Sequence, residues 1–228
     1  SALWINQLDV LNQSFRVIAW DAPGYGLSEG LNTAQPNAED YAQRLLGLID
    51  ALAISQAILV GHSLGALQAS AFAHLYPERV QTLLIANVAQ GYQRSDEESK
   101  SQVYQKRPML LKSLGHAGMA ASRGPHLIYK QDAQALALVT AVMQDLTLDG
   151  FTHASYLLAY DEIRNYLTDI RVPCVVIAGD QDQITPAQGI QDLAAEMQLS
   201  RCHLITDAGH LSYVDQPQQF NDIILSAR

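Results

Sequence analysis

One short run constrains this chain more than any other: Gly61–Gly65 (GHSLG), between the apolar run AILV and the small-residue run ALQASAFAHLY. The first run predicts a buried strand, and the second predicts a helix that ends before Pro77. A serine at so tight a strand-to-helix turn is expected to have a strained backbone, and the flanking glycines leave room for that turn. The pattern predicts that Ser63 stands above a sheet at the start of a helix, where the helix dipole favours negative charge.

Apolar strand-like runs alternate with helical stretches along the chain, which favours an α/β fold with a mostly parallel sheet covered by helices on both faces. The expected strands are Phe15–Trp20, Ala57–Gly61, Val80–Ala86, Val172–Ala178 and the shorter Cys202–Thr206. The expected helices of this core are Asn37–Ala53, Leu64–Tyr76, Pro186–Met197 and Pro217–Ala227. Thr185 is the expected N-cap of the third helix.

The stretch 91–166 interrupts this alternation, because it begins with a polar run and continues with helical patterns and no clear strand. We expect it to form a small helical cap inserted between two parts of the core, residues 1–90 and 167–228. Its apolar positions argue against a disordered linker; they are Leu136, Val139, Val142 and Met143. With 48 % apolar and 16 % charged residues, the composition is typical of a globular enzyme.

The net charge of −9 and the absence of a Lys/Arg cluster disfavour nucleic acid as a partner. No apolar run approaches the roughly 20 residues that span a bilayer, and no signal-peptide pattern is visible, so a cytoplasmic location is expected. Cys174 and Cys202 lie in apolar runs and are expected to be buried, reduced thiols without zinc-site spacing. No metal or organic cofactor is implied.

A serine hydroxyl is a weak nucleophile and needs a base, which an acid must orient. Of the seven histidines, His210 alone follows the last expected strand in a loop at the carboxyl edge of the sheet, where ligands bind in α/β folds. His62 is expected to face away from Ser63, and His203 lies inside the strand run. His210 is therefore the expected base.

The acid is expected on the loop after the preceding strand, which reads Gly179–Pro186 (GDQDQITP). Asp180 and Asp182 compete for this role. The carboxylate that is not used is expected to cap the helix that begins near Pro186.

The order of Ser63, an aspartate and His210 along the chain resembles that of the α/β-hydrolase superfamily. The likeness extends to Asp21–Ser28 (DAPGYGLS), which is similar to the loop after the family's fourth strand, and to Gly209-His210. The family's G-x-x-D pattern matches Gly179–Asp182, and this resemblance selects Asp182 over Asp180. The short cap is similar to those of small esterases and 3-oxoadipate enol-lactonases.

This resemblance implies a serine hydrolase that cleaves a small-molecule carboxylic ester or lactone through an acyl-enzyme on Ser63, with the N–H of Leu64 in the oxyanion hole. A C–C bond hydrolase of ring-cleavage products is the runner-up. It would need cations in the cap, and a solvated surface role is the simpler expectation for each candidate: Arg94, Arg107, Arg123 and Arg164.

Three further functions are weighed for a chain that resembles this family. A cofactor-free haloperoxidase shares the Ser/Asp/His set, whereas a haloalkane dehalogenase is disfavoured because its nucleophile is an aspartate. A non-catalytic binding module is less favoured, because a pure binder has no need for three positioned catalytic residues.

The family normally supplies a second oxyanion donor from a His-Gly loop after its third strand. This chain opens on SALWINQLDVLNQSF, which resembles the helix that follows that loop. The resemblance therefore implies that an N-terminal piece is missing and that only the Leu64 half of the oxyanion hole is present. Loss of one donor costs about 2.7–4 kcal/mol of transition-state stabilisation, so a chain of only these residues is expected to be poorly active, with an uncovered sheet edge.

Overall fold

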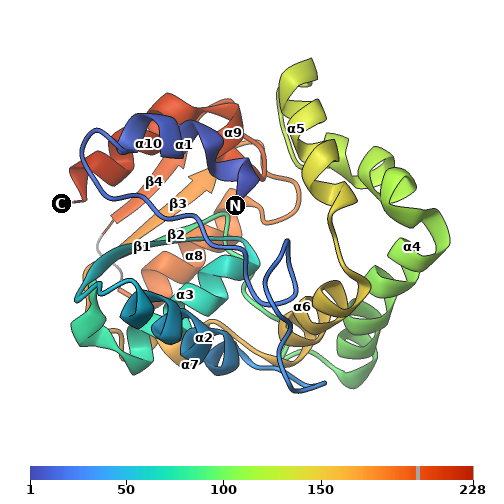
Figure 1. Ribbon diagram of the computed structural model, residues 1–228, viewed down its shortest axis with the longest axis horizontal. Coiled ribbons are helices and arrows are strands. Elements are labelled where there is room, and N and C mark those ends of the chain that lie inside the picture. Colours follow the sequence, from blue (N-terminus) through green and yellow to red (C-terminus); the bar gives the residue numbers. More distant parts are fainter. Residues whose placement is uncertain (199–200, 228) are drawn as a thin grey trace.

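The centre of the protein is a four-stranded sheet, seen in a computed structural model that describes residues 1–198 and 201–227. Its strands are β1 (Ala57–His62), β2 (Val80–Ala86), β3 (Cys174–Gly179) and β4 (Arg201–Ile205). They lie side by side in chain order and every pair is parallel, so all four carboxyl ends meet at one edge (Figure 1). Ligands bind at this edge in α/β sheets.

Helices cover both faces of the sheet (Figure 1). One face carries α2 (Ala38–Ala51), α3 (Leu64–Leu75), α7 (Arg164–Leu167) and α8 (Ala187–Glu196), and the other carries α1 (Ile5–Leu11), α9 (Ser212–Asp215) and α10 (Pro217–Ser226). Side chains alternate between the two faces along each strand. In β2, Leu83 and Ile85 join the first core, whereas Leu84 and Ala86 join the second. The expected α/β fold is confirmed.

Helix α2 shows how the local sequence sets an element boundary. The Asn37 side chain accepts a hydrogen bond from the backbone N–H of Asp40, and the Asp40 carboxylate accepts one from the N–H of Asn37. This reciprocal capping satisfies backbone donors that the first turn leaves open. Tyr41 and Ile49 of this helix are buried against the sheet.

The expected strand Phe15–Trp20 is wrong. The segment pairs with no strand among the described residues, although it is connected to the core through Phe15 and Val17. Ile18 is 43 % exposed, so the run is not buried on both sides as its composition suggests. An apolar run becomes a strand only where a neighbouring backbone pairs with it, and sequence composition does not report that neighbour.

Strand β4 also departs from the expectation of burial. It is an outer strand, and its Cys202 is exposed rather than buried, as is 46 % of Leu204. Cys174, in the inner strand β3, is buried as expected. The difference arises because β3 has strands on both sides and helices on both faces, whereas β4 has only one strand neighbour in the described part of the chain.

Three helices, which we call the cap, lie to one side of the sheet: α4 (Glu97–Arg123), α5 (Ala133–Gln144) and α6 (Leu148–Tyr160) (Figure 1). Helix α4 begins earlier than the polar sequence suggests, because Asp96 caps it through the N–H of Ser99. It is broken at Gly115, whose φ of 65° lies in the left-handed region that glycine favours. The two arms of α4 pack with α6 around Leu111, Met119 and Phe151.

The cap is joined to the core at a close backbone approach. Thr147 donates its hydroxyl to the carbonyl of Gly24 at 2.6 Å, and a side chain on Gly150 would collide with that carbonyl.

Short 3-10 turns complete the chain: η1 (Ala2–Trp4), η2 (Pro77–Arg79) and η3 (Gly124–His126). No helix in the described residues combines the length and apolar character that a membrane span requires.

Candidate active site

Ser63 occupies the turn between β1 and α3 with φ 52° and ψ −119°. This confirms the expected strain, since a non-glycine residue in such a region costs on the order of 1–3 kcal/mol. Surrounding hydrogen bonds hold the turn: the N–H of Ser63 donates to the carbonyl of Ala86 at 2.9 Å, and the carbonyl of Ser63 accepts from the N–H of Ala66 at 3.0 Å. The strain is maintained by the sheet on one side and the helix on the other.

The two glycines of the turn play different parts. A Cβ on Gly61 would lie 2.5 Å from the carbonyl oxygen of Gly65 and 2.8 Å from the Cα of Ala66, so the close packing of strand on helix requires glycine there. A Cβ on Gly65 would meet nothing within 4 Å. The expectation that both glycines avoid a clash is right for Gly61 and wrong for Gly65.

We expect Gly61→Ala to destabilise the protein by about 1–3 kcal/mol, because the added methyl group must displace backbone atoms. Gly65→Ala is the matched control, and its effect should stay within about 1 kcal/mol, because alanine favours the helix and meets open space. Chemical denaturation of both variants measures the difference. Equal losses of stability in the two variants would contradict this account.

His210 lies between Ser63 and Asp182. Its Nε2 is 3.0 Å from the Ser63 Oγ, and its Nδ1 is 2.9 Å from the Asp182 Oδ2. Because a carboxylate can only accept, Nδ1 carries the proton, which leaves Nε2 as the acceptor for the serine hydroxyl. The structure thus brings Ser63 and His210 together with Asp182, the carboxylate that the family resemblance selects. Their roles as nucleophile, base and acid stay predictions.

The loop that carries His210 is held from α9. The carboxylate of Asp215 accepts hydrogen bonds from the N–H of Gly209 at 2.8 Å and of Tyr129 at 2.9 Å. Burial raises the pKa of Asp215, and these hydrogen bonds oppose that rise. These contacts hold Gly209, the residue directly before His210, against Asp215.

The Asp182 carboxylate is buried and surrounded by donors. Besides His210, its Oδ2 accepts from Asn87 Nδ2 at 2.9 Å and from the Thr185 hydroxyl at 2.6 Å. Its Oδ1 accepts from the N–H groups of Ile184 and Thr185 at 2.8 and 3.0 Å. Burial raises its pKa, but the hydrogen bonds and charge of His210 and the bonds from Thr185 outweigh burial, so the pKa lies well below its usual range.

Asp180 contacts neither Ser63 nor His210 in the described hydrogen-bond network. Its Oδ1 accepts from the N–H of Ala208 at 3.3 Å. The expectation that the unused carboxylate caps the next helix is wrong, and so is that of Thr185 as N-cap, because the N-cap of α8 is Pro186. The Thr185 hydroxyl instead donates to Asp182.

Asn87 is a residue that sequence reasoning missed. It follows β2 directly and is fully buried, with a φ of 45°. Its Nδ2 donates to Asp182 and, at 3.2 Å, to the carbonyl of Gly209, while its Oδ1 accepts from Ser212 at 2.6 Å. A polar residue directly after a strand, at the carboxyl edge, is the signal that could have found it.

His62 is in contact with His210 rather than with Ser63. Its Nε2 donates to the backbone carbonyl of His210 at 2.7 Å, and the two imidazole rings lie 4.8 Å apart between centroids. Burial, together with the positive charge that His210 can carry, lowers the pKa of His62 to about 3. His62 therefore stays neutral at pH 7 beside His210.

This lowered pKa predicts a pH dependence of stability. Between about 6.5, the pKa of an unfolded histidine, and about 3, the unfolded chain binds a proton that folded His62 does not bind, so acidification favours unfolding. Between pH 7 and pH 5, the free energy of unfolding of the native protein should fall by about 2 kcal/mol more than that of His62→Gln. Denaturant titrations at both pH values measure this, with the exposed His126→Gln as control. An unchanged pH slope in His62→Gln would count against the assignment.

Leu64 is the first residue of α3, so its N–H has no carbonyl partner within the helix. This places a main-chain donor directly after Ser63, and its oxyanion role stays a prediction. In the described ranges, no group of three or more His, Cys, Asp or Glu side chains is placed to hold a metal ion.

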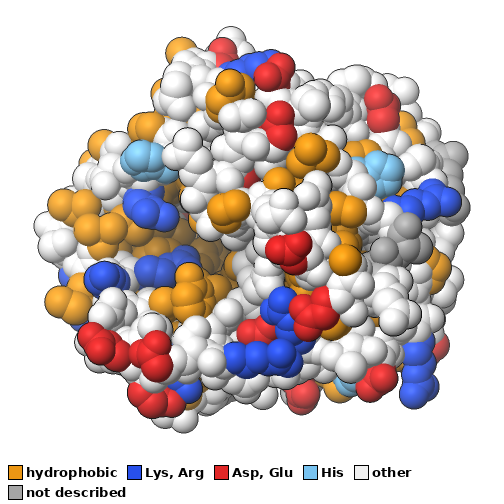
Figure 2. All heavy atoms as spheres, turned by 180° about the vertical axis from the view of Figure 1, so that it is seen from behind, with side chains coloured by type: hydrophobic (Ala, Val, Ile, Leu, Met, Phe, Trp, Pro, Cys, Tyr) orange, Lys and Arg blue, Asp and Glu red, His pale blue; other side chains and the backbone are white. Residues whose placement is uncertain are grey.

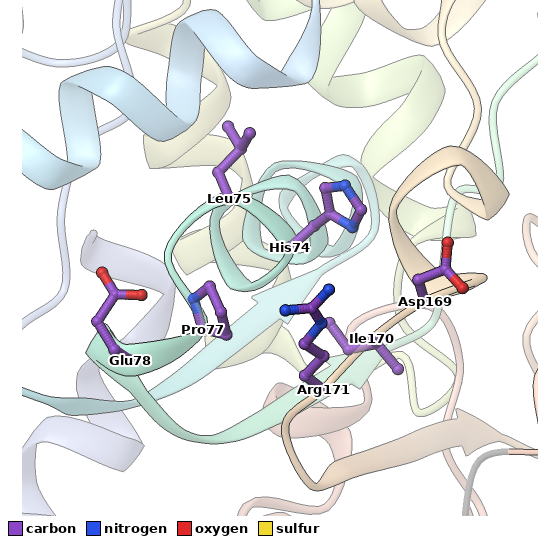
Figure 3. Close-up of a pocket in the computed structure, with 7 residues that line it drawn as sticks. All are labelled: His74, Leu75, Pro77, Glu78, Asp169, Ile170 and Arg171. Atoms are coloured by element: carbon purple, nitrogen blue, oxygen red, sulfur yellow. The ribbon is translucent and has the colours of Figure 1, made fainter.

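A surface hollow at the opposite end of α3 is separate from these residues (Figure 3). It is lined by His74 and Leu75, at the end of α3, by residues of η2, and by the loop that precedes β3. The twelve residues of α3 separate it from Ser63 by about 18 Å. It lies at the amino edge of the sheet and shares no residue with the Ser63 site.

Comparison with known proteins gives matches along almost the whole chain. A putative carbamate hydrolase RutD from Stutzerimonas stutzeri is 30 % identical, covering 99 % of this chain and 86 % of the relative. A 3-oxoadipate enol-lactonase 2 from Acinetobacter baylyi is 28 % identical, covering 98 % and 82 %. Among solved structures, a thermophilic esterase from Thermogutta terrifontis superimposes with a TM-score of 0.87 at 24 % identity, covering 99 % of this chain and 84 % of that one.

The two relatives found by sequence similarity carry the names of hydrolases, which supports the view that this chain is a hydrolase. The structural match, at its low identity, supports the same fold. The sequence model of the alpha/beta hydrolase family matches residues 1–223. The chain belongs to the alpha/beta hydrolase family.

Proposed function

We propose that this protein is a serine hydrolase that cleaves a carboxylic ester or lactone through an acyl-enzyme on Ser63. The observation that carries the proposal is the continuous hydrogen-bond relay from Ser63 through His210 to Asp182, built on a strained turn at the carboxyl edge. Strained turns and buried, donor-rich carboxylates cluster at functional sites.

In the first half-reaction, Ser63 Oγ attacks the substrate carbonyl and its proton passes to His210 Nε2. Asp182 holds the imidazole and stabilises the imidazolium, while the N–H of Leu64 donates to the carbonyl oxygen as it gains negative charge. The bond between the carbonyl carbon and the alkoxy oxygen then breaks, and His210 gives its proton to the leaving alcohol. In a lactone, this alcohol stays attached to the acyl group.

In the second half-reaction, His210 takes a proton from water, and the resulting hydroxide attacks the acyl carbon. The bond to Ser63 Oγ breaks and the serine recovers its proton from His210. His62 supports both halves, because its neutral imidazole adds no charge beside the imidazolium.

A substrate panel tests the proposal: 4-nitrophenyl acetate and butyrate, simple γ- and δ-lactones, and a 4-nitrophenyl carbamate. The names of the relatives motivate the lactones and the carbamate. We expect turnover of an ester or lactone, and a single covalent adduct on Ser63 after treatment with a fluorophosphonate, located by peptide mass mapping. Turnover confined to the carbamate would reject the ester and lactone class, and an adduct on another residue would reject the mechanism.

A further inference from the structure

Arg107, in the first arm of α4, is half-buried rather than solvated, contrary to expectation. Its guanidinium carbon lies 4.8 Å from the centroid of the Phe151 ring. Phe151 is itself packed in the cap core with Leu111 and Met119. A planar guanidinium held over an aromatic face loses little freedom when it binds a ligand through its outer edge.

No carboxylate neutralises Arg107 in the part of the chain that the structure describes. The titratable groups that act on it are Tyr25, Tyr92 and a second cation, Arg123. Neither arginine forms an ion pair or a side-chain hydrogen bond with another described residue, whereas Arg164 pairs with two glutamates. In a chain with 23 acidic and 14 basic residues, two neighbouring arginines without an acid are an unbalanced positive site.

This positive site lies where the cap meets the core. Tyr25 belongs to the loop that joins the cap at Leu146, and Tyr92 follows the carboxyl end of β2. Arg107 therefore packs against α6 through Phe151 and lies within electrostatic range of Tyr25 and Tyr92. Figure 2 shows a hollow on the side of the molecule where α4 lies, with hydrophobic side chains on its floor and Lys or Arg side chains around it.

We propose that Arg107, aided by Arg123, forms an anion subsite under the cap that binds a carboxylate of the substrate, remote from the reacting carbonyl. The inference rests on the proposed ester or lactone hydrolase and narrows it to substrates that carry a free carboxylate. A carboxylate suits the site because it accepts two parallel N–H bonds from one guanidinium. The Phe151 ring, against which the guanidinium packs, offers apolar surface for the carbon chain of such a substrate.

Two esters of equal length test the subsite: mono-4-nitrophenyl glutarate, which has a free carboxylate, and its neutral methyl ester. We expect the native protein to prefer the acid in kcat/KM. Arg107→Met should lower the acid-to-methyl-ester ratio at least tenfold, since a hydrogen bond to a charged group is lost. Arg107→Lys should restore part of the ratio through its charge without the paired bonds.

Arg94→Met is the matched control, because it removes the same charge from an exposed position. Its ratio should equal that of the native protein. A native protein without preference for the acid, or an Arg107→Met variant in which both esters fall equally, overturns the subsite.

Failure of the subsite is distinguishable from failure of the proposed function. If neither ester is hydrolysed, the hydrolase assignment fails, and glutarate binding to the native protein by calorimetry still tests the subsite. Binding that is at least tenfold weaker in Arg107→Met supports it. Equal binding in the two proteins, or no binding to either, overturns it.

Discussion

Ser63→Ala is expected to lower kcat for 4-nitrophenyl acetate by about 10⁴- to 10⁶-fold, because the acyl-enzyme cannot form without the hydroxyl. Alanine keeps the Cβ and the main-chain bonds to Ala86 and Ala66, so the turn should survive. KM should change little, since the hydroxyl contributes mainly during bond formation. Steady-state kinetics against the native protein measure the effect.

Ser113→Ala is the matched control, because it removes a hydroxyl from an exposed site on α4. Its activity should equal that of the native protein, and both variants should keep the native thermal midpoint within a few degrees. If folded Ser63→Ala released nitrophenol at the native rate, the serine mechanism would be wrong.

Asp182→Asn is expected to lower kcat by about 10⁴-fold. The amide can turn its NH₂ group toward His210 Nδ1, which favours the tautomer with the proton on Nε2. That nitrogen then cannot accept the proton of Ser63. The bonds from Asn87 and Thr185 further disfavour a neutral side chain at this position, because both are donors to the carboxylate.

Asp180→Asn tests which of the two carboxylates in the loop, Asp180 or Asp182, acts as the acid. Its only described side-chain bond is the 3.3 Å contact with the N–H of Ala208, which an amide oxygen can also accept. We expect its kcat to stay within about threefold of the native value, a small effect typical of a lost surface interaction. If Asp180→Asn proved the more damaging variant, Asp182 would lose its assignment as acid.

The parts of the site that could be predicted from sequence are those defined by local patterns. The glycine spacing around Ser63, the apolar run before it and the small-residue helix after it predict the strained turn. Apolar runs likewise predicted β1, β2 and β3 to within about two residues, because a strand buried on both faces must be apolar along its length.

The outer segments of the sheet were predicted less well, for a physical reason. Phe15–Trp20 has the composition of a buried strand, but pairing depends on a neighbour that composition does not report. Cys202, like Cys174, lies in a run that was expected to be a buried strand, yet an outer strand leaves it exposed. Strand order, and hence burial, is a property of the assembled sheet.

The sequence by itself determined the strained turn at Ser63 and the place of His210 after the last strand. Residues alone left Asp180 and Asp182 open, and only resemblance to a family chose between them. The tertiary structure decided the rest: the five donors to Asp182, the contact of His62 with His210, and the half-burial of Arg107 without an acid. Hydrogen bonds such as those from Asn87 and Ser63 join groups 95 and 147 positions apart. Such distances are set by strand register and helix packing, which no local pattern encodes.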